Sequence, residues 1–266
     1  MCGRCWKRRS ATVACLILWA TTIPGGMVRV SAEDFTVVTK LFSSAQKEPI
    51  GENRTIFREG KVYDLPSFGD QVTFFDRANK QFVLVNTAKK TQTQVSFEQL
   101  VHYCDWLKEK AVKSNNPMLR FCAAPQFEVR TGKKDTQLLF ESPVLTYRVE
   151  ATTPDEPAIA DEYREFSDWY ARLNAMFRPQ SLLPFPRLMV NQQLAQKKLI
   201  PEKVSLRIGS SSGVGESPLE LPSRHEVRVG LLNQDRERIA WLESCLRKFS
   251  EVELVAYQAQ DGAEKK

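Results

Sequence analysis

Apolar and polar side chains alternate along short segments in the part of the chain that follows residue 32. Segments of this kind occupy residues 35–41, 55–57, 62–65 and 72–75, and residues 82–85 are apolar on both faces. An alternation with a period of two is typical of half-buried strands. Gly60-Lys61 and Asn79-Lys80 separate neighbouring segments at the spacing of hairpin turns. The pattern therefore predicts an antiparallel sheet.

From residue 96 onward, apolar residues recur at the spacing of an α-helix. Ser96 and Gln99 match a capping box, and Asn115-Asn116-Pro117 predicts the end of this helix. Its apolar stripe consists of Phe97, Leu100, Val101, Cys104 and Leu107. The sequence thus predicts one amphipathic helix after the first set of strands.

A second helix is predicted after Thr153. Thr153 serves as its N-cap, Pro154 fits its first turn and Glu156 completes the cap. Its stripe consists of Ile159, Tyr163, Phe166, Tyr170, Leu173 and Phe177. A third helix is expected over residues 186–198. A last helix is expected after a cap at Asn233, with the stripe Ile239, Leu242, Leu246 and Phe249.

Further strands are predicted at residues 127–129, 136–140, 145–152, 204–208 and 225–232. About ten or eleven strands result, and antiparallel sheets of this width usually curl. The predicted fold class is therefore α+β, with a single curled antiparallel β-sheet, a half-barrel, and amphipathic helices on its concave face. Any part of that face left uncovered by the helices would be an apolar cavity.

The start of the chain has the three parts of a signal peptide. Arg4 and Lys7 belong to a basic beginning, the run from Ala11 to Ile23 is apolar, and Val30 and Ala32 fit a cleavage site. We therefore expect residues 1–32 to be removed on export to the periplasm or the extracellular space. Residues 33–257 are predicted to form one domain, and residues 258–266 a disordered polar tail.

Removal of this segment changes the charge of the protein. The chain has 38 Lys and Arg residues and 32 Asp and Glu residues, a net charge of +6. Five of the basic residues lie in the first 32 positions, so the remainder carries 33 basic and 32 acidic residues. A nearly neutral protein has no sequence-wide electrostatic attraction for nucleic acid, which excludes nucleic acid as a partner.

Three cysteines remain after residue 32: Cys104, Cys122 and Cys245. Their odd number excludes a full disulfide framework. A single bridge between Cys104 and Cys122 and three separate buried thiols both stay open.

A search for catalytic residues finds none. Gly209, Ser211 and Gly213 match the G-x-S-x-G pattern, but Gly and Pro in residues 213–218 exclude the helix that a nucleophile elbow requires. Residues 209–223 are instead predicted to be a long exposed loop. His102 and His225 lack acids or cysteines at ligand spacing, so a solvated or capping role is expected for both. We predict a protein that is not an enzyme and needs no metal or cofactor.

Three aromatic residues of the second helix are candidates for a ligand site. Phe166, Trp169 and Tyr170 lie where they can line the expected cavity, and they equally suit a packed core. The sequence leaves both roles open.

Residues 57–100 carry a resemblance to known proteins. Phe-Arg-Glu-Gly-Lys-Val-Tyr-Asp, Val-Thr-Phe-Phe-Asp and Phe-Val-Leu-Val-Asn, with a lysine-rich turn before Ser96, resemble part of an uncharacterised family of exported bacterial proteins. More distantly, the chain resembles the lipoprotein-carrier (LolA-like) superfamily. That resemblance implies a curled sheet holding acyl chains under helical lids. It implies no role for any individual residue.

Two functions from different classes follow. One is an exported carrier or sensor of a lipid or other apolar or acylated ligand, with an envelope protein as partner and only transient contact with the membrane. The other is a structural or interaction module whose core is fully packed. Open volume separates them, because ligand sites usually enclose about 300 to 1,000 Å³, whereas a scaffold is filled by its own side chains.

Overall fold

Twelve strands form one open sheet, and its two edges are β12 and β7. The structure is a computed structural model that describes residues 33–43, 48–178, 181–209 and 219–262, which belong to one compact unit. The strands are β1 (Phe35–Leu41), β2 (Gly51–Arg58), β3 (Lys61–Pro66), β4 (Gln71–Asp76), β5 (Gln81–Asn86), β6 (Thr91–Ser96), β7 (Glu128–Thr131), β8 (Gln137–Glu141), β9 (Leu145–Thr152), β10 (Ile200–Ile208), β11 (Leu219–Val229) and β12 (Ser250–Glu251). The predicted signal peptide, residues 1–32, lies outside the described residues.

The order of the strands is β12-β6-β5-β4-β3-β2-β1-β11-β10-β9-β8-β7. Eleven strands pair antiparallel, and only the two-residue β12 pairs parallel, with β6. Two meanders, β1 to β6 and β7 to β11, therefore meet where β11 pairs with β1 and Val37 lies opposite Val227. The predicted curled antiparallel sheet with helices is confirmed, with one small parallel strand added.

The hairpin turns explain the register of the first meander. Glu59 and Gly60 have φ angles of 51° and 74° and connect β2 to β3 as a two-residue turn. Positive φ at both central residues gives a turn whose twist matches that of the strands. The turn lies one residue before the predicted Gly60-Lys61, and Lys61 is the first residue of β3.

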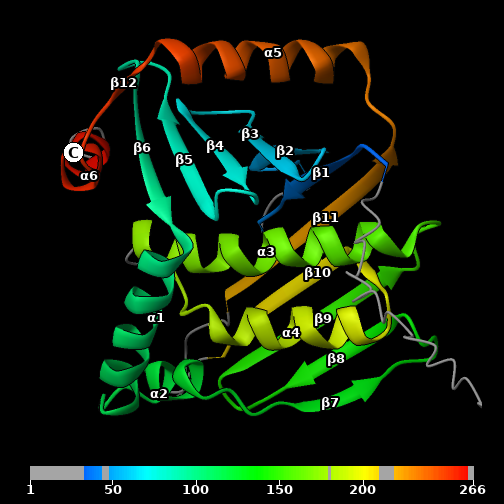
Figure 1. The fold of residues 1–266 in the computed structure, drawn as a ribbon. Helices are drawn as coiled ribbons and strands as arrows, with labels where there is room; N and C mark the ends of the chain where they lie inside the picture. The colour runs from blue at the N-terminus through cyan, green and yellow to red at the C-terminus, as the bar shows by residue number, and fades with distance from the viewer. Residues whose placement is uncertain (1–32, 44–47, 179–180, 210–218, 263–266) are drawn as a thin grey trace, which may run out of the picture. The chain divides into compact units, whose positions relative to one another are not determined.

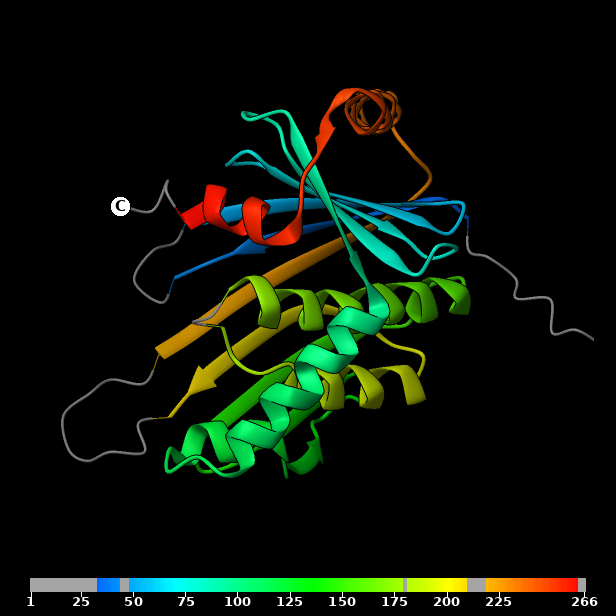
Figure 2. The ribbon, with the colours of Figure 1, turned by 60° about the vertical axis from the view of Figure 1, so that its left-hand side comes forward.

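Six helices complete the described part of the fold (Figure 1). They are α1 (Phe97–Val112), α2 (Pro117–Ala123), α3 (Pro157–Phe177), α4 (Phe185–Gln196), α5 (Asn233–Lys248) and α6 (Leu254–Gly262). Figure 2 shows the sheet between two helical layers, with α1, α3 and α4 on one side and α5 on the other. We call the side of α1, α3 and α4 the inner face of the sheet and the opposite side the outer face.

The inner face holds two packed clusters. One joins β1 to β6 with α1 and α3, and Phe57, Phe75 and Phe82 surround Phe166 of α3. The other joins β8 to β10 with α4, where Val190 and Leu194 pack on Tyr147 and Val149. The stripe predicted along α3 is therefore the side that faces the sheet.

Helix α5 corrects the expectation that the helices lie on the concave face. Its Ile239 and Leu242 pack on Tyr63 and Phe74, whose side chains lie on the outer face of β3 and β4. Strands β2 to β5 are thus buried on both faces, which explains why residues 82–85 are apolar throughout.

Helix α3 begins later than the sequence predicted. Pro157 takes the first turn, and the N-cap is Glu156, which makes no side-chain capping bond. Glu156 instead accepts a hydrogen bond from the backbone N–H of Glu33 at 3.2 Å. Neither Thr153 nor Pro154 caps the helix, because β9 continues to Thr152 and the chain needs residues 153–156 to turn.

Three further boundaries differ from the prediction. The cap of α5 is Leu232 rather than Asn233, because the Asp235 carboxylate accepts the backbone N–H of Leu232. Helix α2 follows α1 after a short break, since the Asn116 side chain caps it. The tail predicted to be disordered from residue 258 continues as α6 to Gly262.

Candidate functional site

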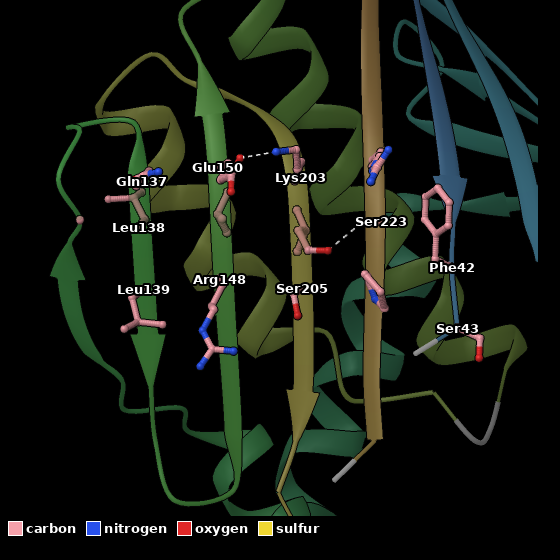
Figure 3. Close-up of a pocket in the computed structure, with 15 residues that line it drawn as sticks. Phe42, Ser43, Gln137, Leu138, Leu139, Arg148, Glu150, Lys203, Ser205 and Ser223 are labelled. Atoms are coloured by element: carbon pink, nitrogen blue, oxygen red, sulfur yellow. Dashed lines mark hydrogen bonds and ion pairs between the residues drawn. The ribbon is translucent and has the colours of Figure 1, made fainter. Parts of the chain in front are cut away.

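A pocket with a volume of about 820 Å³ lies on the outer face of β8 to β11, next to the end of β1. Figure 3 shows these strands side by side, with the helices behind them. The pocket is lined by Phe42, Ser43, Gly132, Gln137, Leu138, Leu139, Arg148, Val149, Glu150, Lys203, Val204, Ser205, Pro222, Ser223 and Arg224. It is therefore formed by the face of the sheet opposite to α3 and α4.

Alternation along the strands sends these side chains outward. Tyr147 and Val149 of β9 pack in the inner core, so Arg148 and Glu150 point to the outer face. Ser205 of β10 lies directly opposite Arg148 in the register. The side chains that form the walls of the pocket therefore have the sequence pattern of an ordinary solvated strand face.

The pocket combines apolar and charged groups. Phe42, Leu139 and Pro222 supply apolar surface. Lys203 forms an ion pair with Glu150 at 2.6 Å, and the guanidinium of Arg224 lies over the Phe42 ring, 5.2 Å from its centroid. Such a site suits a ligand with an apolar part and a polar part.

The three aromatic candidates from the sequence lie elsewhere. Phe166 is buried among phenylalanine rings of the inner face, and Trp169 stacks on Phe97 with ring centroids 3.9 Å apart. Tyr170 packs beside Phe166 and bonds to Asp64. None of the three lines the large pocket, and all three pack in the inner core.

Asp64 lies at the centre of a buried polar group under α3. Its Oδ1 accepts hydrogen bonds from the Thr55 hydroxyl at 2.7 Å and from the Asn53 amide. Burial raises the pKa of Asp64, and the bonds from Thr55, Asn53 and Tyr170 oppose that rise. Burial also raises the pKa of Tyr170, so its hydroxyl stays protonated and serves as a donor.

His225 was expected to be solvated or capping, and the structure corrects this. It lies within β11, where its Nδ1 is 3.0 Å from the Thr39 hydroxyl and its Nε2 is 3.0 Å from the Ser223 hydroxyl. Burial, aided by the charge of Arg187, lowers the pKa of His225 to about 3. The imidazole is therefore neutral at physiological pH, whereas His102 is exposed on α1 as expected.

The Ser223–His225 pair does not make a nucleophilic site. The second nitrogen of His225 faces a threonine hydroxyl rather than a carboxylate, and a base with a pKa of about 3 takes up protons weakly. Ser211 and Gly213 of the G-x-S-x-G pattern lie outside the described residues. Among the residues that the structure describes, no group of histidines, cysteines and acids is arranged to hold a metal ion.

The acids of α3 hold its neighbours in place. Asp168 accepts a bond from Asn191 of α4 at 2.8 Å and pairs with Arg164, and Lys198 pairs with Asp161 at 2.9 Å. The three remaining cysteines are free and buried.

Comparison with known proteins gives distant likenesses among solved structures only. No protein-family model and no curated protein matches the chain. Among solved structures, the chain is similar to a LolA superfamily protein from Nitrosomonas europaea, with 6% identity and a TM-score of 0.29. The match covers 77% of this chain and 88% of that chain. In the described residues, no helix is both long enough and apolar enough to cross a membrane.

Sequence reasoning missed the pocket because its residues carry no motif. One signal was present: Arg148 and Glu150 alternate with buried residues on the most regular strand of the chain. That signal shows which face is exposed, but it does not show that neighbouring strands surround a hollow.

Proposed function

We propose that this protein is an exported, non-enzymatic binder of a lipid or another apolar or acylated ligand, held in the outer-face pocket. The observation that carries the proposal is the pocket volume of about 820 Å³. This volume falls within the range of about 300 to 1,000 Å³ that ligand sites usually occupy. Transfer of such a ligand requires brief contact with a membrane or with an envelope protein.

The composition of the pocket supports the same class of ligand. Phe42 and Leu139 offer apolar surface to a chain, while Arg148 and Arg224 offer polar contacts to its end. The alternative function, an interaction module with no ligand, is favoured by the dense aromatic packing of the inner face around Phe166. The two functions differ in whether the outer pocket is occupied.

Extraction and titration test the proposal. Organic extraction of the purified protein, followed by mass spectrometry, should recover a bound lipid, and a fluorescent fatty acid should bind to the emptied protein. Leu139→Trp adds bulk inside the pocket and should weaken binding at least tenfold. Val255→Trp, at an exposed position of α6, is the matched control and should leave binding unchanged.

Absence of both extracted lipid and fatty-acid binding in the wild type would leave the interaction module as the better account. Equal binding by Leu139→Trp and the wild type would place the ligand outside this pocket. Unchanged thermal unfolding of both variants shows that the comparison concerns binding and not folding.

Export rests on the beginning of the sequence and has its own test. The basic, apolar and small-residue parts of residues 1–32 support cleavage after Ala32. Mass spectrometry of the protein purified from its native host should give Glu33 as the first residue. Recovery of the chain with Met1 retained would contradict export by cleavage.

A further inference from the structure

Three basic side chains lie side by side at the edge of the outer pocket. In the sheet register, Arg224 of β11 is opposite Lys40 of β1 on one side and opposite Lys203 of β10 on the other. All three stand on the outer face, because Thr39 bonds to His225, whose ring contacts Tyr163 of α3, and Val204 packs in the inner core. Like charges directly opposite one another on neighbouring strands destabilise a sheet.

Carboxylates compensate only the two ends of this row. Lys203 pairs with Glu150 at 2.6 Å, and Lys40 approaches Glu52 at 3.9 Å. The guanidinium of Arg224 contacts the Phe42 ring. Among the residues that the structure describes, no carboxylate forms an ion pair with it. The centre of the row is thus the least neutralised position.

A second guanidinium adds to this charge one row further along the sheet. Arg148 lies between Leu139 and Ser205 in the register and has no carboxylate partner among the described residues. On β11, Glu220 accepts a hydrogen bond from the Ser205 hydroxyl at 2.6 Å. Of the charged residues that line the pocket, three are basic and one is acidic.

We propose that the ligand of this pocket is an anionic amphiphile whose carboxylate or phosphate group is held by Arg224 and Arg148, with Lys203 beside them. This inference rests on the proposed function and names the class of its ligand. Guanidinium groups bind carboxylate and phosphate oxygens in a planar, two-pronged geometry. The apolar part of the ligand then lies on Phe42 and Leu139, which stand beside Arg224 and Arg148, so head and chain are bound in the same pocket.

A bound anion also accounts for a row that would otherwise cost stability. It places negative charge beside the three basic groups at the point where the protein supplies none. The Phe42 ring lies 5.2 Å from the Arg224 guanidinium and attracts it through its π face, which favours a guanidinium position inside the pocket.

The test compares ligands that share a dodecyl chain and differ in the head group. Calorimetric titration of the full protein, below the micelle concentration of each ligand, uses dodecanoate, dodecyl phosphate, the uncharged dodecyl maltoside and the cationic dodecyltrimethylammonium. Inorganic phosphate without a chain is a fifth ligand. We expect the two anionic amphiphiles to bind at least tenfold more tightly than the uncharged one.

Substitutions separate head-group recognition from chain binding. Arg224→Gln and Arg148→Gln should each weaken the anionic amphiphiles by about tenfold and leave dodecyl maltoside unchanged. Arg120→Gln, at an exposed position of α2, removes the same charge outside the pocket and should change neither affinity. Raising the salt from 0.05 M to 0.5 M should reduce the preference for anions, because mobile ions screen exposed charges.

Each outcome decides the inference. Equal affinity for anionic and uncharged amphiphiles overturns it while leaving the proposed function intact. No binding of any amphiphile overturns both. Inorganic phosphate could instead bind as tightly as dodecyl phosphate, with both affinities reduced equally by Arg224→Gln. That result indicates a site for small anions and overturns the inference that the ligand is an amphiphile.

Discussion

Trp169 stacks on Phe97, with ring centroids 3.9 Å apart and ring planes inclined by 16°. Phe97 is the first residue of α1, and Trp169 lies in the middle of α3. Arg172 places its guanidinium 5.0 Å from the centroid of the Trp169 ring. This contact joins two helices of the inner layer, so α1 and α3 cover the sheet as one packed surface rather than as separate lids.

Phe166→Ala should destabilise the protein severely. Phe166 is buried and contacts the rings of Phe57, Phe75 and Phe82 from three strands. Truncation leaves a cavity in a dense core, which typically costs about 3 to 5 kcal/mol. Urea denaturation of wild type and variant measures the difference in the free energy of unfolding.

The control for this prediction is Trp106→Ala, which removes a large aromatic side chain from an exposed position of α1. Its effect should stay within about 0.5 kcal/mol. A loss below about 1 kcal/mol in Phe166→Ala would show that the inner face tolerates open space, and would return Phe166, Trp169 and Tyr170 to the role of cavity lining.

His225 should make stability depend on pH between about 3 and 6.5. Its pKa is lowered from 6.5 to about 3 in the folded protein by burial and by the charge of Arg187. In this interval the unfolded chain binds a proton that the folded chain does not, so stability rises with pH. The curve should level off above pH 6.5.

His225→Gln removes this contribution. The difference in the free energy of unfolding between wild type and variant, measured by urea denaturation from pH 3 to 8, should slope below pH 6.5 and be flat above it. Asp64→Asn is an informative second variant, because the raised pKa of Asp64 makes stability fall as pH rises above 3.8. A difference curve for His225→Gln that is flat throughout would refute the neutral, half-buried imidazole.

Asp235→Ala should cost several kcal/mol. This fully buried carboxylate accepts the backbone N–H of Leu232 at 3.0 Å, which caps α5, and it pairs with Arg54 at 3.1 Å. Removal leaves a mostly buried guanidinium without its partner, which typically costs about 3 to 5 kcal/mol.

Asp235→Asn keeps the acceptor for the cap and loses the charge, so its effect should be smaller. Asp105→Ala, on the exposed side of α1, should have little effect. The measurement is again chemical denaturation. Similar stabilities of Asp235→Ala and the wild type would mean that α5 is held to the outer face by its apolar stripe alone.

The thiols at positions 104, 122 and 245 should not react in the native protein. Burial raises the pKa of Cys104 and of Cys122 to about 11 and also raises the pKa of Cys245. At pH 8 few thiolates form, and the buried sulfur atoms are inaccessible to reagents.

Iodoacetamide labelling followed by peptide mass spectrometry checks this prediction. The three sites should stay unlabelled in the folded protein and become fully labelled in guanidinium chloride. A peptide that joins Cys104 to Cys122 would instead establish the bridge that the sequence left open.

The sequence determined the elements whose side chains repeat with a clear period. Strand β9 was predictable because burial alternates at each residue from Leu145 to Ala151. The start of α1 was predictable because the capping box is local: Gln99 N–H donates to the Ser96 hydroxyl, and Ser96 N–H donates to the Gln99 side chain. In both cases residues a few positions apart supply the whole signal.

Elements without such a signal were missed. Strand β6 contains Thr91, Gln92, Thr93 and Gln94, which do not alternate in polarity. It is a strand because β5 pairs along its whole length. Strand β12 and helix α6 likewise exist because they lie against β6, through pairs such as Ser250 with Thr91 and Thr91 with Gln260.

The tertiary structure alone decided which faces became core and which became pocket. A period of two shows that Arg148, Lys203 and Arg224 share exposed faces of their strands, but it does not show that β9, β10 and β11 are neighbours. That order comes from the pairing of β9 with β10 and of β10 with β11, in which Lys203 lies opposite Glu150 on one side and opposite Arg224 on the other. Backbone hydrogen bonds between strands are the same for every side chain, so the pairing of distant strands follows from packing the whole core. The row of basic residues and the hollow beside it arise only from that packing.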